Sequence, residues 1–281
     1  MPMPAALVTR FAPSPTGELH LGHAFAAMVA HEWARASGGI FRLRIDDLDH
    51  TRCRPQYEEG IYRDLAWLGL GWQGPVRRQS AHMNDYAAAL ETLKGQGLLY
   101  PCFCTRADIQ AEVQAIAGAP QGPEGPLYPG ACRGLSAQVA MARIADGARH
   151  AWRLDVARLP GGEALTRSIG DVVLGRKEMP ASYHLAVVLD DAAQGITLVT
   201  RGQDLEAVTP LHMALQTVLC LRRPGYAHHR LITDERGQRL AKRDGARALS
   251  TLRAQGATPA DVRRMLDWPA MQALITSRLE A

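Results

Sequence analysis

Apolar runs and helically spaced apolar residues alternate along the first part of the chain. The run at residues 5–8 predicts a buried strand. Residues 24–37 carry apolar side chains at helical spacing, and Gly38-Gly39 predicts the end of that helix. Residues 40–45 predict a second strand, which runs into an acidic cluster at residues 46–49. Strand, loop, helix and strand together predict a βαβ unit, and such units bind ligands at the carboxyl ends of their strands.

Similar patterns continue through the rest of the chain. They predict helices at residues 58–68, 80–95 and 204–221, and strands at residues 152–156, 182–191 and 196–200. Ser80 and Asp204 are predicted N-caps, because a side-chain oxygen can accept a hydrogen bond from a free backbone N–H. The last two strands are apolar along most of their length, which is typical of parallel strands buried on both faces. About 36 residues follow Gly245, and their apolar spacing predicts two or three short helices.

Composition narrows the class of protein. The 281 residues are 47% hydrophobic and 21% charged, as in ordinary soluble globular proteins. The net charge of +4 fits a polyanionic partner without requiring one. We expect a cytoplasmic protein with no membrane partner, because no signal peptide or apolar run of about 18 residues is present. We also expect a monomer. The five cysteines are then expected to be reduced thiols or metal ligands.

The loop at residues 10–23 suits a phosphate. Two prolines restrict its backbone, whereas Gly17 and Gly22 allow a ligand to come close. His20 and His23 flank Gly22 at the predicted helix start, where free N–H groups and the helix dipole favour an anion. Imidazoles that donate there would bind a phosphate more tightly as its charge grows in a transition state. The alternative is that the two histidines only cap the helix, and the short His-x-Gly-His spacing does not separate these readings.

Three cysteines form a candidate metal site. Cys102 and Cys104 make a Cys-x-Cys pair, and Cys132 follows within a proline- and glycine-rich stretch at residues 118–134. Converging thiolates suit zinc, and Tyr128 is the nearest oxygen candidate for a fourth ligand. Buried, inert cysteines are the alternative.

Two cationic features occur in the second half of the chain. Arg201 follows the predicted strand at residues 196–200, where a planar guanidinium suits a carboxylate. An ordinary ion pair with Asp190 or Asp204 is the alternative. Residues 233–245 contain glycine and four cations, which suits phosphates, although a solvated turn is the commoner fate of such a run.

Several segments together resemble one family. Residues 10–23 (RFAPSPTGELHLGH) resemble the signature of class I aminoacyl-tRNA synthetases of the glutamyl type, and residues 43–49 (LRIDDLD) resemble its acidic motif. Residues 239–243 (RLAKR) resemble the second class I signature, Lys-Met-Ser-Lys-Ser. The resemblance implies an α/β fold with a class I synthetase, Rossmann-like parallel sheet, an inserted zinc-bearing module and a short helical C-terminal part.

The resemblance also implies a domain organisation. The predicted segments are a first catalytic half at residues 1–97, an inserted module with the zinc site at 98–165, a second catalytic half at 166–235, and the lysine loop with a short helical region at 236–281. Full glutamyl-tRNA synthetases continue with a large anticodon-binding domain, for which we expect no room here.

Site residues follow from the same resemblance. The positions that match catalytic residues are His20, His23 and Lys242. Those that match the glutamate pocket are Arg10, Phe11, Ala12, Pro13, Ser14, Asp46, Tyr183 and Arg201. The ATP positions are His20, Gly22, His23, Arg239 and Lys242, and the structural zinc ligands are Cys102, Cys104, Tyr128 and Cys132.

Two motifs depart from the family pattern. Asp46 stands where glutamate is usual, so its shorter side chain reaches the substrate ammonium through closer backbone or through a bridging water. Arg239, Ala241 and Arg243 replace the first Lys, the first Ser and the last Ser of the lysine loop, whereas Lys242 keeps the central cation.

The Cys-x-Cys, Tyr, Cys set and the expected truncation resemble one branch, the glutamyl-Q tRNA(Asp) synthetase family. The resemblance implies that L-glutamate is activated with ATP, with Mg²⁺ bridging the phosphates, and is transferred to the queuosine base at the wobble position of tRNA(Asp). The alternatives are a small glutamyl-tRNA synthetase that charges a tRNA 3′ end, a nucleotidyltransferase that shares the His-x-Gly-His loop, and a tRNA-binding remnant without activity.

Overall fold

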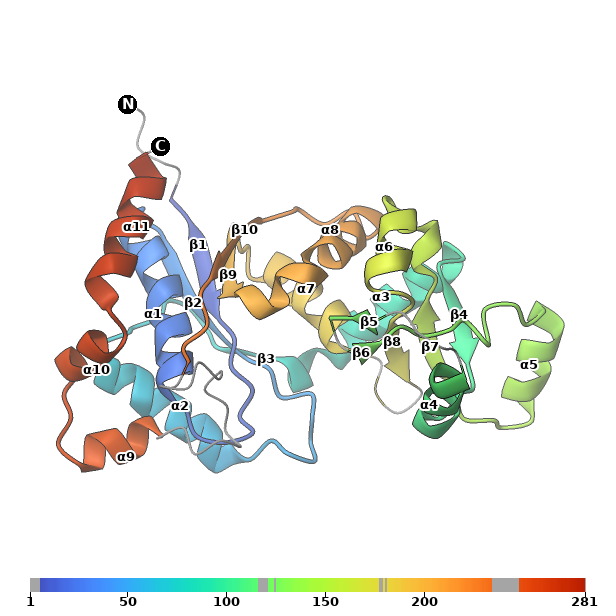
Figure 1. Cartoon of the computed structure of the whole chain (residues 1–281), viewed down its shortest axis with the longest axis horizontal. Helices are drawn as coiled ribbons and strands as arrows, with labels where there is room; N and C mark the ends of the chain where they lie inside the picture. The colour runs from blue at the N-terminus through green and yellow to red at the C-terminus, as the bar shows by residue number, and fades with distance from the viewer. Residues whose placement is uncertain are drawn as a thin grey trace. The chain divides into compact units, whose positions relative to one another are not determined.

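The computed structural model of the chain describes residues 6–115, 121–123, 125–176, 179, 181–233 and 248–280 (Figure 1). The chain divides into two compact units. The first unit comprises Met1–Ala81, Ala193–Glu206 and Pro224–Ala281, and the second comprises His82–Ala192 and Ala207–Arg223. The four predicted segments use other boundaries and stay a prediction. In the described part of the chain, no helix has the length and apolar character needed to cross a membrane.

The first unit is built on parallel strands. Its elements are β1 (Val8–Phe11), α1 (Leu21–Ala36), β2 (Ile40–Ile45), α2 (Pro55–Leu68), β3 (Arg77–Arg78), β9 (Leu198–Gly202), β10 (Gly225–His229), α9 (Leu249–Ala254), α10 (Pro259–Met265) and α11 (Trp268–Glu280). β1 pairs with β2, β2 with β3, and β9 with β10, all in parallel. The Thr197 amide donates to the Val8 carbonyl at 2.9 Å, which joins the β9 side to β1.

The predicted βαβ unit is confirmed, with one shift. β2 and α1 agree with the prediction, but β1 begins three residues later than the apolar run at residues 5–8. Two polar residues extend this strand because their side chains have buried partners. Thr9 donates to the Ala30 carbonyl at 2.7 Å, and Arg10 donates to the Thr200 carbonyl at 2.9 Å. Side-chain partners of this kind are not visible in a hydrophobic pattern.

Helix α1 forms the centre of the first hydrophobic core. Its buried face, which includes Phe25 and Trp33, packs in one cluster with Phe41 of β2 and with Trp268 and Ile275 of α11. The three C-terminal helices therefore complete the core that α1 begins. Figure 1 shows α11 beside α1, as this cluster requires. The prediction of two or three short C-terminal helices is confirmed.

The second unit has an antiparallel sheet. Its elements are α3 (Met83–Gly95), β4 (Leu99–Cys102), α4 (Arg106–Ala115), β5 (Gln121–Gly122), β6 (Gly125–Pro126), α5 (Ala137–Ala145), β7 (Ala151–Leu154), α6 (Gly162–Ser168), β8 (Val173–Arg176), α7 (Tyr183–Ala193) and α8 (Thr209–Val218). Its three-stranded sheet has the order β4-β7-β8, and β5 pairs with β6. Pro101 faces Trp152 and Cys102 faces Ala151 in the β4–β7 register.

Three predicted elements are wrong. Residues 182–191 form helix α7 and not a strand, because a helix buried nearly all round produces the same continuous apolar run as a buried strand. Ser80 does not cap α3: its hydroxyl donates to Asp47 at 2.5 Å, and the helix begins at Met83. Asp204 lies in a short 3₁₀ helix, and α8 begins at Thr209.

Candidate active site and metal centre

His20 and His23 together cap the N-terminus of α1. The His20 Nδ1 accepts a hydrogen bond from the Gly22 amide at 3.1 Å, and the His23 Nδ1 accepts one from the His20 amide at 3.2 Å. An Nδ1 that accepts carries no proton, so the neutral form of each ring has its N–H at Nε2. Capping and anion binding are therefore compatible, because capping uses one ring nitrogen and anion binding uses the other.

Gly22 is required by the packing of these rings. A Cβ at this position would lie 3.0 Å from the Cε1 and 3.2 Å from the Nδ1 of His20. The two imidazole centroids are only 3.9 Å apart, so the His20 ring has little room to move toward His23. A side chain at residue 22 would therefore displace the cap.

The chain returns to this helix start just after the lysine loop. His20 forms an isolated antiparallel bridge with Ala248, and the Leu249 amide donates to the Leu19 carbonyl at 2.8 Å. Arg239 and Lys242, the predicted ATP contacts of the loop, lie outside the described residues. Ala248, which follows residues 234–247, therefore lies beside His20.

Two buried arginines lie on neighbouring strands of the first unit. Arg10 of β1 and Arg201 of β9 are each 7% exposed. The Arg10 Nη1 donates to the Thr200 carbonyl, which comes directly before Arg201. The Arg201 Nε donates to the His228 Nε2 at 3.4 Å, and burial together with this guanidinium lowers the pKa of His228. The Arg10 guanidinium therefore contacts the backbone next to Arg201, and the carboxylate-binding role of both arginines stays a prediction.

Asp46 follows the carboxyl end of β2 and is held by Arg44. The fully buried Arg44 donates through Nε to Oδ1 at 2.7 Å and through Nη2 to Oδ2 at 3.4 Å. The sequence did not predict this contact, because Asp46 lies beyond the last residue of β2. The Asp46 amide donates to the Pro13 carbonyl at 3.0 Å, which ties the end of β2 to the loop after β1.

The remaining glutamate-pocket residues occupy different settings. Phe11 ends β1 and is buried, as is Pro13, whereas Ala12 is half-buried and Ser14 is exposed. The predicted residues of the first unit thus gather at the carboxyl ends of β1, β2 and β9, as expected for a parallel sheet. Tyr183 belongs to the second unit, where it begins α7.

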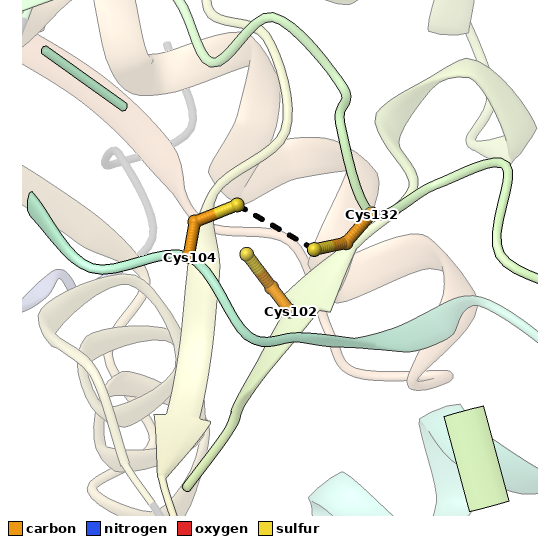
Figure 2. A group of neighbouring side chains, drawn as sticks. All are labelled: Cys102, Cys104 and Cys132. Carbon is orange, nitrogen blue, oxygen red and sulfur yellow. Dashed lines mark hydrogen bonds between the residues drawn. The ribbon is translucent and has the colours of Figure 1, made fainter. Parts of the chain in front are cut away.

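The four predicted metal ligands converge in the second unit. The sulfurs of Cys102, Cys104 and Cys132 lie within 4.8 Å of one another, and those of Cys104 and Cys132 are 3.5 Å apart (Figure 2). The Tyr128 hydroxyl lies 3.4 Å from the sulfurs of both Cys102 and Cys104. Tetrahedral zinc with Zn–S bonds of about 2.3 Å separates its sulfurs by about 3.8 Å, so the donor set fits this ion.

Protonation of these ligands depends on their burial. Burial raises the pKa of the Cys104 thiol to about 12 and places the pKa of the Tyr128 phenol above its ordinary value. Burial also acts on Cys102, but hydrogen bonds with Tyr128 and Arg153 outweigh it and lower the pKa of that thiol. A bound cation favours thiolates, so metal binding here would release protons.

A parallel sheet with a helix that starts at the carboxyl edge of its first strand is typical of nucleotide-binding domains. Residues 6–273 match the family model described as "tRNA synthetases class I (E and Q), catalytic domain". The chain belongs to this family and is an ATP-dependent ligase of the aminoacyl-tRNA synthetase type.

The chain is also similar to curated proteins. A glutamyl-Q tRNA(Asp) synthetase of Rhodobacter capsulatus is 51% identical over 277 residues, which cover 92% of this chain and 99% of that protein. The protein of the same name from Nitratidesulfovibrio vulgaris is 41% identical, over 90% of this chain and 83% of its own length.

Solved structures show the same fold. A glutamate-tRNA synthetase from Elizabethkingia anophelis matches 85% of this chain with a TM-score of 0.73 and 27% identity. This chain covers 53% of that protein, about half its length. A methionyl-tRNA synthetase of Mycobacterium tuberculosis, at 11% identity and a TM-score of 0.62, shares the fold alone.

Proposed function

We propose that the protein activates L-glutamate with ATP and transfers the glutamyl group to the queuosine base at the wobble position of tRNA(Asp). The observation that carries this proposal is the similarity to proteins named glutamyl-Q tRNA(Asp) synthetase, which reaches 51% identity over 92% of the chain. The geometry of the α1 terminus and of the two buried arginines supports the activation step.

In the first step, an oxygen of the glutamate α-carboxylate attacks the α-phosphorus of ATP. A carboxylate–phosphorus bond forms, the bond from that phosphorus to the bridging oxygen breaks, and pyrophosphate leaves. The Nε2–H groups of His20 and His23 donate to the phosphate oxygens as their charge grows, and Gly22 lets the nucleotide approach the helix start. Lys242 and Arg239 are assigned to the remaining phosphate charge. Mg²⁺, when bound with ATP, would neutralise charge on the phosphates.

Glutamate recognition requires cations for two carboxylates and an acid for one ammonium. Arg10 and Arg201 are assigned to the carboxylates because a buried guanidinium binds them strongly. Asp46 is assigned to the ammonium, and its contacts with Arg44 fix the position of its carboxylate. Closer backbone or a bridging water would make up for the shorter side chain. Other contacts with glutamate, through side chains or backbone, are assigned to Phe11, Ala12, Pro13, Ser14 and Tyr183.

In the second step, a hydroxyl of the queuosine base attacks the glutamyl carbonyl. An ester bond forms, the bond from the carbonyl to the phosphate oxygen breaks, and AMP leaves. The mixed anhydride is reactive, so positioning of the hydroxyl supplies most of the acceleration.

The metal centre is assigned a structural role in the second unit. Cys102, Cys104, Tyr128 and Cys132 would hold zinc in a closed tetrahedral site, which joins the end of β4 to the loop before α5. The cytoplasmic location and the monomeric state stay predictions.

The activation step is tested by glutamate-dependent exchange of pyrophosphate into ATP. We expect the His20→Ala, His23→Ala double variant to lose about 10²–10³-fold in rate, as when other charge-stabilising donors are removed. His31→Gln is the control, because His31 lies in the same helix and packs against Phe41. An unchanged exchange rate in the double variant would refute the role of the two histidines.

A small glutamyl-tRNA synthetase is the second candidate, favoured by the structural similarity to the Elizabethkingia enzyme. Such an enzyme would charge tRNA that lacks queuosine. Exchange without added glutamate would indicate a nucleotidyltransferase, and no exchange under any condition would indicate a tRNA-binding remnant.

A further inference from the structure

Tyr183 differs from the rest of its helix in exposure. Its side chain is 39% exposed, whereas the next five residues of α7, from His184 to Val188, are all buried. An exposed aromatic residue at the first position of a buried helix does not contribute much to a hydrophobic core. Its ring instead rests on two polar side chains.

These two side chains are His184 of α7 and His212 of α8, both within the second unit. The centroid of the Tyr183 ring lies 5.5 Å from that of His184 and 5.8 Å from that of His212, with the ring planes inclined at 66° and 60°. Such edge-to-face contacts are favourable and depend on ring orientation. The direction of the Tyr183 ring therefore depends on the two imidazoles.

The imidazoles are held by a hydrogen bond between them. The His184 Nδ1 and the His212 Nε2 are 3.0 Å apart, and the side chains are 4% and 1% exposed. One nitrogen must donate and the other must accept, so the bond restricts both ring orientations and both tautomers. It also joins α7 to α8.

Two buried imidazoles fill space in a core less favourably than two apolar side chains would. Burial of polar groups is unfavourable unless their hydrogen bonds are made, and apolar side chains would pack here without that requirement. A satisfied buried hydrogen bond does, however, fix the orientation of both rings. The Tyr183 ring packs against both imidazoles, so its orientation is fixed with theirs.

We propose that His184 and His212 are positioning residues, which hold the Tyr183 ring in the orientation that binds glutamate. This inference rests on the proposed function, in which Tyr183 contacts that substrate. Neither histidine need touch glutamate, and each acts through the tyrosine.

The test uses pyrophosphate exchange with the full-length protein. His212→Leu keeps a similar volume but removes the hydrogen bond, and we expect it to raise the KM for glutamate about tenfold while the KM for ATP and kcat stay within twofold. His212→Gln, whose amide reaches the place of Nε2, should restore most of the affinity. Met213→Ala, an exposed neighbour on α8, is the control and should have no effect.

A double-variant comparison separates positioning from general damage. In a Tyr183→Ala background the His212→Leu change should add less than twofold to the KM for glutamate, because its effect passes through the tyrosine. His184→Leu should behave in the same way and provides an independent variant if His212→Leu does not fold.

The outcomes against the proposal are distinct. A full tenfold effect of His212→Leu in the Tyr183→Ala background, or an equal rise in the KM for ATP, would overturn the positioning role alone. An unchanged KM for glutamate in both leucine variants would do the same. Exchange by the unmodified protein that ignores glutamate would contradict the proposed function and this inference together.

Discussion

At the scale of single residues, the start of α1 shows how an imidazole caps a helix through one ring nitrogen while its neutral form carries the proton on the other. The Nδ1 atoms of His20 and His23 accept backbone hydrogen bonds that would otherwise be missing in the first turn. The same bonds place the proton of each neutral ring on Nε2. Capping and phosphate binding are therefore compatible, because they use different nitrogens of the same rings, and the phosphate contact stays a prediction.

Gly22→Ala tests this arrangement. The added methyl would lie 3.0 Å from the His20 ring and must displace it. Because displacements of about 1 Å can cost 10²-fold in rate, we expect pyrophosphate exchange to fall at least tenfold. Gly60→Ala in α2 is the matched control, since a Cβ there meets nothing within 4 Å and should stabilise the helix by about 1 kcal/mol. Equal exchange rates in the two variants would contradict the account.

At the scale of elements, the candidate metal centre lies where the chain leaves β4. Cys102 is the last residue of β4 and Cys104 lies two residues beyond it, and the Phe103 amide between them donates to the Cys132 sulfur at 3.4 Å. Arg153 of β7 covers the Tyr128 ring at 3.8 Å. The sulfurs of Cys102 and Cys104 lie close to that of Cys132 (Figure 2), and the Tyr128 hydroxyl lies 3.4 Å from both of the first two.

Tyr128→Phe tests the fourth ligand. The variant keeps the ring beneath Arg153 and removes only the hydroxyl, so we expect the affinity for zinc to fall at least tenfold, measured by competition with a chromophoric chelator. Tyr100→Phe is the control, because its hydroxyl donates to Asp171 at 2.5 Å and takes no part in the cluster. Wild-type zinc affinity in Tyr128→Phe would remove this residue from the ligand set.

The contact between α1 and α11 should depend on pH. Glu32 accepts hydrogen bonds from Arg35, at 2.8 Å and 2.6 Å, and from Gln272 of α11 at 2.9 Å. The bond from Arg35 is the largest cause that lowers the pKa of Glu32 below its ordinary value of 4.5. A depressed carboxyl pKa stabilises the fold above the unfolded pKa, and the stabilisation is lost as pH falls through the folded value.

We therefore expect Glu32→Gln to lower the free energy of unfolding by about 1–2 kcal/mol at pH 7, and the difference to shrink as pH falls below about 4. Urea titrations of both proteins at several pH values measure this difference in the free energy of unfolding. Glu163→Gln is the control, because Glu163 makes an exposed pair with Arg167 worth a few tenths of a kcal/mol. A loss that stays constant down to pH 3 would contradict the role of the charge.

Element prediction from the sequence succeeded where one face was polar. The predicted strand at residues 40–45 and the helix of the βαβ unit are confirmed because their periods of two and 3.6 differ clearly. Prediction failed at α7, where burial on nearly all sides removed the period. The caps at Ser80 and Asp204 failed for another reason: Ser80 has a distant partner in Asp47, and Asp204 precedes α8 by a 3₁₀ turn.

Prediction of the site depended on spacing along the chain. The side chains of Cys102, Cys104, Tyr128 and Cys132 lie close together, and their role as zinc ligands stays a prediction. The pairing of Asp46 with Arg44 and of His184 with His212 was not predicted. The second pair joins different helices, and no local pattern in the sequence reports such a contact.

At the scale of the whole molecule, the proposed function combines activation of glutamate with transfer to a modified base of tRNA(Asp). The family membership shows the ligase chemistry, and the similarity to glutamyl-Q tRNA(Asp) synthetases supports the choice of acceptor. The related glutamate-tRNA synthetase shares the fold but not the length. The acceptor is therefore the part of the proposal that needs the most direct test.

The decisive measurement is the transfer of labelled glutamate, with ATP present, to purified tRNA(Asp) prepared with and without queuosine. The account predicts label only on the tRNA that carries queuosine, and none on tRNA(Glu). Equal labelling of tRNA that lacks queuosine, or labelling of tRNA(Glu) at its 3′ end, would contradict it.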